Sequence, residues 1–227
     1  MRIRRMLLTI ATATVLAGTA VGVIAATGSA RPASSHGNAG ASHDMAGMAG
    51  MGNGTDDASS ATGAEPARLV RQLARARLAT AKYATNLNAA KADGYQIITR
   101  MIPDMGFHFL NPSVTGFDVR HPHILVYEHR NGQWQLGALE WVFPQTPATP
   151  PLDGATYGSF GAACHYVDGT FVFQQSKDAC EAKSPQSGAK FNFWHPDLFT
   201  MHVWLWYPNP AGLYSGTNPL VAPFNGG

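Results

Sequence analysis

Three ionisable residues lie in the middle of strand-like apolar segments: His108 in MGFHFLNP, Glu140 in LGALEWVFP and His202 in TMHVWLWYP. An unpartnered buried polar group costs about 1–3 kcal/mol, and a buried carboxylate costs more unless it is paired or bound to a cation. If the three strands are neighbours, two imidazoles and one carboxylate converge on one pocket. This is the ligand set of a His2Glu zinc site or of a facial-triad iron site, which leave positions open for water or substrate.

Each residue taken alone also fits a core position with its own neighbour, and Arg100 or Arg120 could pair with Glu140. The chain has no H-E-x-x-H, G-x-S-x-G, P-loop or Rossmann glycine motif. Three functions therefore stay open: a metal-binding protein, a metal-dependent enzyme that uses the same residues, and a metal-free structural or small-ligand-binding module. The predicted ligand is a divalent or copper ion, or a small polar molecule, and no nucleotide cofactor is expected.

Four further histidines are secondary candidates for the site. His121 and His123 lie on one side of the extended segment RHPHILVYE, at a spacing that suits a metal but is also typical of a solvent-exposed strand entrance. His165 and His195 lie in long connections, where either could close the mouth of a pocket.

The pattern of apolar residues after residue 64 predicts the helix and strands that position these residues. A helix of about 27 residues is predicted from Glu65 to Asp93, with an apolar stripe at steps of three and four. Short β-branched and aromatic segments then predict strands, and Asn131-Gly132 predicts a hairpin. We expect a single α+β domain over residues 65–227, with the long amphipathic helix packed on a curved, mainly antiparallel sheet or small open barrel.

The alternation around His202 gives a specific expectation. His202, Trp204 and Trp206 fall on one face of the predicted strand, and Met201, Val203 and Leu205 fall on the other. Both faces are apolar, which is typical of a strand covered on both sides. The sequence therefore predicts that His202 is buried.

The start of the chain has the pattern of a secretory signal peptide over residues 1–30: Arg2, Arg4 and Arg5, an uncharged apolar stretch, and small residues at the cleavage site. An uncleaved membrane anchor is the alternative, since the stretch is about long enough to span a bilayer. Cleavage would remove three of the 16 Lys and Arg and none of the 14 Asp and Glu, so the net charge would fall from +2 to −1. We therefore expect a secreted or cell-envelope protein with no nucleic-acid partner and, after cleavage, no membrane contact.

Cys164 and Cys180 are the two cysteines of the chain, and an even pair in an exported protein predicts a disulfide. Their spacing matches no zinc motif. Closing a loop of about 15 residues would contribute roughly 3 kcal/mol to stability.

Residues 31–64 are rich in Gly, Ala, Ser and Asn and predict a disordered linker. The linker contains imidazoles and regularly spaced thioethers, which suit Cu(II) and Cu(I) respectively. This composition predicts weak copper binding, and a spacer that happens to contain methionine is the alternative. The candidate ligands are His36, His43, Met45, Met48 and Met51.

Two of these segments carry a resemblance. The motifs G-x-H-x-x-N-P, in GFHFLNP, and H-V-W-L-W-x-x-N-P-x-G, from His202 to Gly212, resemble an uncharacterised family of exported bacterial proteins. The resemblance covers roughly residues 85–221 and implies that His108, Glu140 and His202 share one site. Trp141 stands where the family pattern leads us to expect Tyr, and the family implies no activity.

Overall fold

The computed structural model describes residues 59–221, with side chains from residue 66 onward, and these residues belong to one compact unit, Asn53–Gly227. The predicted signal peptide and the His/Met segment from His36 to Met51 lie outside the described residues. Within Ser59–Val221, no helix is both long enough and apolar enough to cross a membrane.

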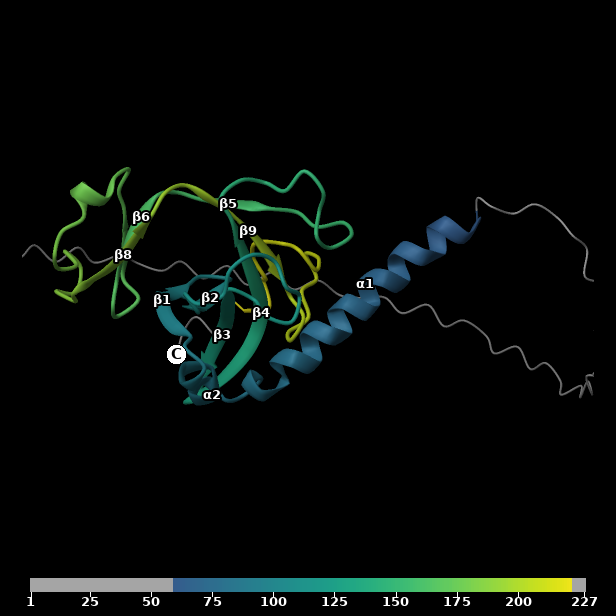
Figure 1. The fold of residues 1–227 in the computed structure, drawn as a ribbon. Coiled ribbons are helices and arrows are strands. Elements are labelled where there is room, and N and C mark those ends of the chain that lie inside the picture. The colour runs from purple at the N-terminus through teal and green to yellow at the C-terminus, as the bar shows by residue number, and fades with distance from the viewer. Residues whose placement is uncertain (1–58, 222–227) are drawn as a thin grey trace, which may run out of the picture. The chain divides into compact units, whose positions relative to one another are not determined.

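The described chain is mostly sheet, as Figure 1 shows. The helical elements are α1 (Ser59–Thr80), η1 (Ala81–Tyr83), α2 (Leu87–Ala92) and η2 (Lys177–Ala179). A six-stranded antiparallel sheet has the order β1-β2-β3-β4-β9-β5, and a three-stranded sheet has the order β7-β6-β8. The strands are β1 (Gln96–Ile102), β2 (Gly106–Leu110), β3 (Ile124–Arg130), β4 (Gln133–Phe143), β5 (Gly158–Phe160), β6 (Ala163–Tyr166), β7 (Phe171–Phe173), β8 (Phe191–His195) and β9 (Leu198–Val203).

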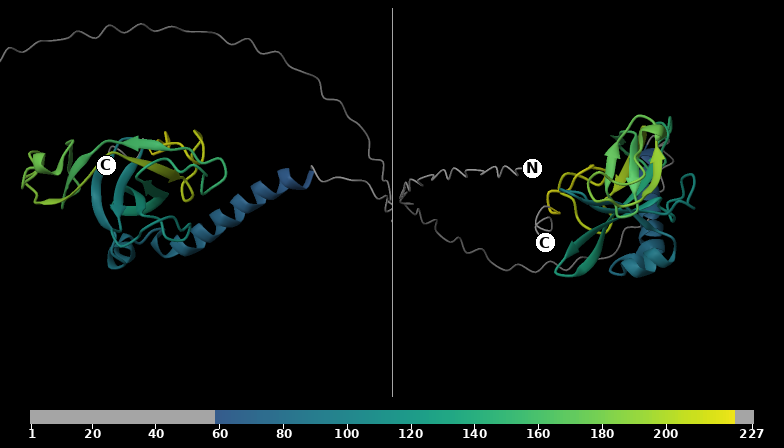
Figure 2. Two further views of the ribbon diagram at one scale, coloured as in Figure 1. Left: turned by 45° about the horizontal axis from the view of Figure 1, so that its top comes forward. Right: turned by 90° about the vertical axis from the view of Figure 1, so that its left-hand side faces the viewer.

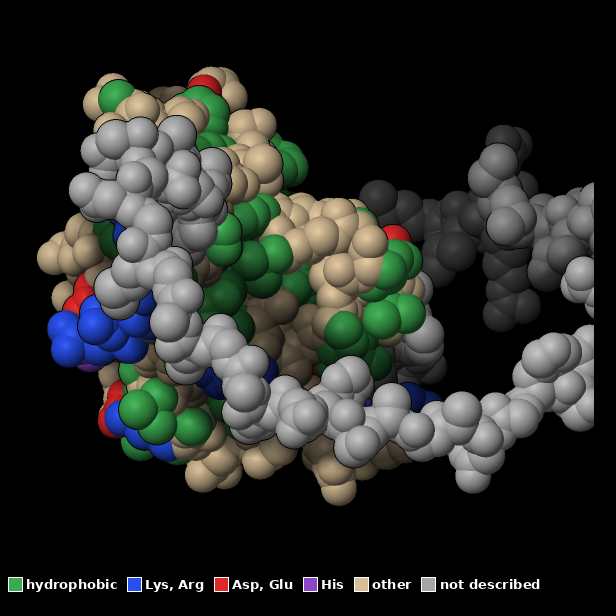
Figure 3. Space-filling view, turned by 90° about the vertical axis from the view of Figure 1, so that its right-hand side faces the viewer, with side chains coloured by type: hydrophobic (Ala, Val, Ile, Leu, Met, Phe, Trp, Pro, Cys, Tyr) green, Lys and Arg blue, Asp and Glu red, His purple; other side chains and the backbone are tan. Residues whose placement is uncertain are grey.

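The predicted α+β fold, built on one long helix over Glu65–Asp93, is wrong. The large sheet curves into a half-barrel, and the helical segment is interrupted after Thr80 and again before Leu87 (Figures 1 and 2). The apolar stripe is nevertheless the face that packs: Ala76 and Tyr83 are buried, and Leu69 and Leu73 lie against them. On the face seen in Figure 3, the largest group of Lys and Arg side chains lies at the left edge, and others lie at the lower left and near the centre.

Tertiary hydrogen bonds are made at the break between η1 and α2. The Tyr127 hydroxyl donates to the carbonyl of Tyr83 at 2.8 Å, and the backbone N–H of Leu136 donates to the carbonyl of Ala84 at 2.8 Å. The Tyr83 carbonyl also accepts the N–H of Asn86 at 3.2 Å, so a turn that is bonded to β3 and β4 separates η1 from α2. The side chain of Asn86 then accepts from the N–H of Ala89 at 3.0 Å and caps α2.

The two faces of the large sheet have different roles. Leu125, Tyr127, Leu139 and Met201 belong to the core cluster that also includes the buried helical residues. Alternation places their neighbours in β2, β3, β4 and β9 on the opposite face, where a cavity is found. The cavity is therefore separated from the helices by the thickness of the sheet.

The strand predicted around His202 ends earlier than expected, at Val203. The N–H of Leu205 donates to the carbonyl of Val203 at 2.8 Å, which turns the chain. Trp204 is buried with Val126 and Ala138. Trp206 instead donates its indole N–H to the hydroxyl of Thr80 at 2.9 Å. The two indoles therefore do not share one strand face, because the regular alternation stops before them.

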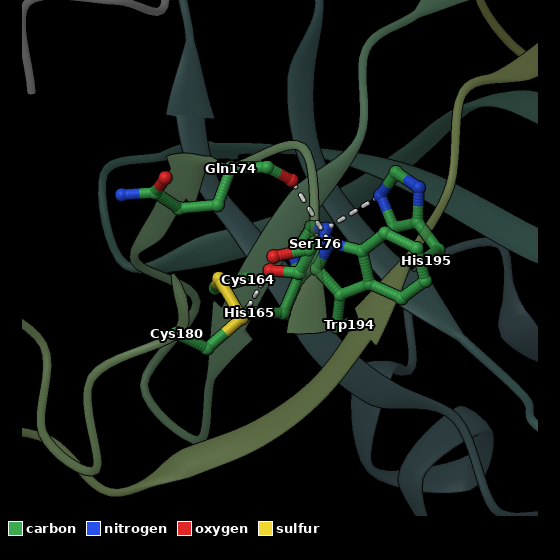
Figure 4. The surroundings of a disulfide bond; sticks show 7 residues. All are labelled: Cys164, His165, Gln174, Ser176, Cys180, Trp194 and His195. Carbon is green, nitrogen blue, oxygen red and sulfur yellow. Dashed lines mark hydrogen bonds between the residues drawn. A yellow bond between two sulfur atoms is a disulfide. The ribbon is translucent and has the colours of Figure 1, made fainter. Parts of the chain in front are cut away.

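Two strands of the three-stranded sheet, β6 and β8, form where long connections were predicted, so the sequence pattern did not reveal them. Cys164 in β6 forms a disulfide with Cys180, as predicted, and the two Cα atoms lie 5.7 Å apart (Figure 4). The Arg100 N–H donates to the carbonyl of Gly169 at 2.8 Å, which connects this sheet to β1.

Candidate metal centre

Strand register brings His108, Glu140 and His202 to one place on the cavity face. Glu140 in β4 lies directly opposite His202 in β9. His108 in β2 lies opposite Val126 of β3, and Val126 in turn lies opposite Ala138 of β4, two residues before Glu140. Directly opposed side chains on one face have Cβ atoms about 5 Å apart, so the three polar groups meet across four strands.

The three side chains are buried and their polar atoms face one another. Their relative exposures are 4%, 3% and 5% for His108, Glu140 and His202. Glu140 Oε2 lies 3.7 Å from His108 Nε2 and 3.6 Å from His202 Nε2. Within the described part of the chain, neither Glu140 Oε2 nor His202 Nε2 has a hydrogen-bond partner. The cluster therefore contains buried polar atoms whose interactions are incomplete.

This geometry fits a single metal ion. One candidate ligand atom from each residue lies within 4.8 Å of the others. Ligands about 2.0–2.1 Å from a tetrahedral zinc ion are roughly 3.3 Å apart, so the two Glu140–histidine separations of 3.6 and 3.7 Å need to shorten by a few tenths of an ångström, and the two imidazoles, whose ligand atoms lie within 4.8 Å of each other, must also come closer. Three protein ligands would leave at least one position open on such an ion.

Thr99 in β1 orients the His108 ring. Its hydroxyl lies 2.7 Å from His108 Nδ1 and also accepts the backbone N–H of His108 at 3.2 Å. This contact leaves Nε2 as the nitrogen that faces Glu140. Burial lowers the pKa of His108 to about 4, partly opposed by the Glu140 carboxylate, so the ring is neutral at pH 7. A neutral imidazole is the form that binds metals.

The cluster opens onto a cavity of about 530 Å³ between the two sheets. Its lining is mainly apolar and aromatic, which is typical of a small-molecule site with a few polar groups. Residues that line it include Ile98, Leu110, Ile124, Phe160, Phe171 and Phe193.

The alternative partners considered for Glu140 bond elsewhere. Arg100 forms an ion pair with Asp168, and Arg120 forms one with Asp118 at 3.1 Å. In a metal-free module the three groups would lie far apart, each with its own neighbour. This is not what the structure shows. Glu140 is instead adjacent to two imidazoles.

The structure separates the secondary candidates His121 and His123. His121 is exposed, and its Nδ1 lies 2.9 Å from an oxygen of Asp118. His123 is buried and lines the cavity, where its Nδ1 accepts the backbone N–H of Val142 at 3.1 Å. The two rings therefore do not act as a pair, because the backbone N–H occupies the lone pair of one and Asp118 binds the other.

His165 and His195 also line the cavity, from β6 and β8. They are not part of the cluster around Glu140, and their Nε2 atoms lie 3.0 Å from each other. Sequence reasoning did not single out Thr99. Its signal was a hydroxyl residue inside the apolar segment YQIIT, which could have suggested a hydrogen bond to a neighbouring strand.

No family model matches the chain, and comparisons with curated proteins and with solved structures find no match. The motif-based resemblance to exported bacterial proteins thus stays a prediction.

Proposed function

We propose that the protein is an exported metal-binding protein that binds copper or zinc through His108, Glu140 and His202. The observation that carries the proposal is the burial of three ligand-type groups within 4.8 Å of one another. Two of their atoms, Glu140 Oε2 and His202 Nε2, lack any hydrogen-bond partner among the described residues. A cation between them would compensate the buried carboxylate and complete both interactions.

Export is supported by the signal-like pattern of residues 1–30 and by the Cys164–Cys180 disulfide, which is compatible with an oxidising compartment outside the cytoplasm. In this proposal His36, His43, Met45, Met48 and Met51 buffer or deliver copper.

Elemental analysis of the purified protein tests the metal site. We expect His202→Ala and Glu140→Gln to contain about one equivalent of copper or zinc less than the wild type. Adding the same metal should raise the melting temperature of the wild type more than that of His202→Ala or Glu140→Gln, because a ligand that binds the folded state stabilises it by RT ln(1 + [L]/Kd).

His121→Gln is the matched control, because His121 is exposed and lies outside the cluster. It should keep the metal and its effect on melting. Unchanged metal content in folded His202→Ala would contradict the proposal. Glu140→Gln preserves the shape of the side chain, so the test does not depend on one variant alone.

A metal-dependent enzyme is the second candidate, and the cavity of about 530 Å³ beside the cluster favours it. In that function, an open position on the ion would face a bound apolar substrate, and Glu140 would act as ligand or general base. Cobalt substitution tests this possibility. Adding azide should change the visible spectrum of the cobalt protein if a coordination position is open, and an unchanged spectrum would favour a closed binding site.

A further inference from the structure

A second pair of metal-ligand side chains faces the same cavity from the three-stranded sheet. His165 in β6 lies opposite Phe193 of β8, and His195 lies two residues beyond Phe193 on the same face. Their Nε2 atoms are 3.0 Å apart, and Figure 4 shows the two rings directed toward each other beside the Cys164–Cys180 disulfide.

The outer nitrogen of each ring is already committed as a donor. His165 Nδ1 lies 2.8 Å from the carbonyl oxygen of Ile98, and His195 Nδ1 lies 2.7 Å from the carbonyl oxygen of Pro196. A carbonyl oxygen can only accept, so each Nδ1 carries the hydrogen. In the neutral rings both Nε2 atoms are then acceptors, and two lone pairs face each other at 3.0 Å.

A cation between the two nitrogens would remove the repulsion between their lone pairs. This cation is either a proton or a metal ion. The burial of His165, which is 1% exposed, disfavours a shared proton, because a buried imidazolium loses its hydration by water. The hydrogen bonds at the outer nitrogens are the second-shell contacts that typically fix metal-binding histidines.

The surroundings favour an ion of low charge. The Phe193 ring stacks on His165 with centroids 4.7 Å apart, and Phe160 and Phe171 flank the same ring. Two neutral imidazoles in an aromatic environment compensate a divalent charge poorly, because burying such a charge without anionic ligands is costly. Cu(I) carries one charge and accepts two nitrogen ligands.

We propose that His165 and His195 bind one Cu(I) ion through their Nε2 atoms, as a second site in the cavity. With metal–nitrogen bonds of about 2.0 Å, the observed separation of 3.0 Å corresponds to an angle of roughly 100° at the metal, and a linear arrangement requires the rings to separate by about 1 Å. This site does not depend on a metal at His108, Glu140 and His202.

Anaerobic competition of the full chain with a chromogenic Cu(I) chelator tests the site. We compare the wild type with His195→Gln, His195→Phe and His202→Gln, which all keep the same N-terminal segment. Both His195 variants should bind one Cu(I) fewer than the wild type, whereas His202→Gln should keep this equivalent and lose zinc binding. His195 is only partly buried and its ring contacts the ring of Phe160, so a phenyl side chain fits this position. We therefore expect His195→Phe to fold, and it serves as a second variant if His195→Gln does not.

Equal Cu(I) stoichiometry in the wild type and in either folded His195 variant would overturn the second site and leave the proposed function standing. X-ray absorption with less than one equivalent of Cu(I) gives a second test. A shell of two nitrogen ligands that the wild type shows and His195→Phe loses supports the His165–His195 site, and a shell containing sulfur in the wild type overturns it as the tightest Cu(I) site of the chain.

Discussion

Glu128 is a second buried carboxyl group, on β3 and apart from the cluster around Glu140. Only 1% of its surface is exposed, and neither of its oxygens has a hydrogen-bond partner in the region that the structure describes. Burial raises the pKa of Glu128 from 4.5 to about 7. The folded state therefore favours the protonated side chain.

The pH dependence of stability follows from this raised pKa. Between pH 4.5 and about 7 the unfolded state releases the proton while the folded state retains it, so the free energy of unfolding falls as the pH rises and is lowest above about pH 7. Glu128→Gln mimics the protonated group and should raise the free energy of unfolding above pH 7 by roughly 2–3 kcal/mol, with little change below pH 4.5. Urea unfolding at several pH values measures both effects.

An exposed glutamate provides the control for this experiment. Glu181→Gln should change the stability at pH 8 by less than about 0.5 kcal/mol. If Glu128→Gln is no more stable than the wild type at pH 8, Glu128 is not destabilised by ionisation in the folded state.

At the scale of elements, the three-stranded sheet consists of short strands. The strands β6 and β7 contain four and three residues, and β8 contains five. The Cys164–Cys180 disulfide closes a loop across a sequence separation of 16 and ties β6 to the end of η2. Strands this short form few inter-strand hydrogen bonds, so their stability depends on a cross-link such as this disulfide.

Removing the disulfide should therefore weaken the sheet that carries His165 and His195. We expect the double variant Cys164→Ala/Cys180→Ala to lose about 3 kcal/mol of unfolding free energy, because the unfolded chain regains the entropy of an open loop. Guanidinium unfolding measures the loss, and dithiothreitol should destabilise the wild type but not the variant. Equal stability of the two proteins would show that the bond adds nothing to the fold.

At the scale of the whole molecule, the folded unit and the His/Met segment have separable roles in the proposed function. Residues 31–58 precede α1, and they include His36, His43 and Met45 among the candidate copper ligands. The core clusters of the described unit are formed by residues that follow this segment.

Deleting residues 31–58 should lower the copper stoichiometry, because it removes imidazole and thioether ligands. The melting temperature should stay within about 2 °C, since the core is untouched. Copper titration and thermal unfolding of the same samples measure the two quantities. A deletion variant that retains every copper equivalent would exclude this segment as a copper ligand, whereas one with a much lower melting temperature would show that the segment contributes to the fold.

Several features were determined by the sequence itself. The prediction of a hairpin at Asn131-Gly132 is confirmed, because Arg130 and Gln133 pair across it. The prediction that His202 is buried is also confirmed. The predicted disulfide is present as well. Each of these depends on neighbouring residues or on a single possible cysteine pairing, so local pattern was sufficient.

Other features were decided only by the tertiary structure. The break between η1 and α2 is bonded to donors from Tyr127 and Leu136, which are far away in the chain. The meeting of Glu140 with His202 requires β4 and β9 to pair across a separation of about sixty residues, and the contact of His165 with His195 requires β6 to pair with β8. Alternation fixes which side chains share a face of one strand, but it carries no information about which strand lies next to it, because hydrogen bonding between backbones is the same for every sequence.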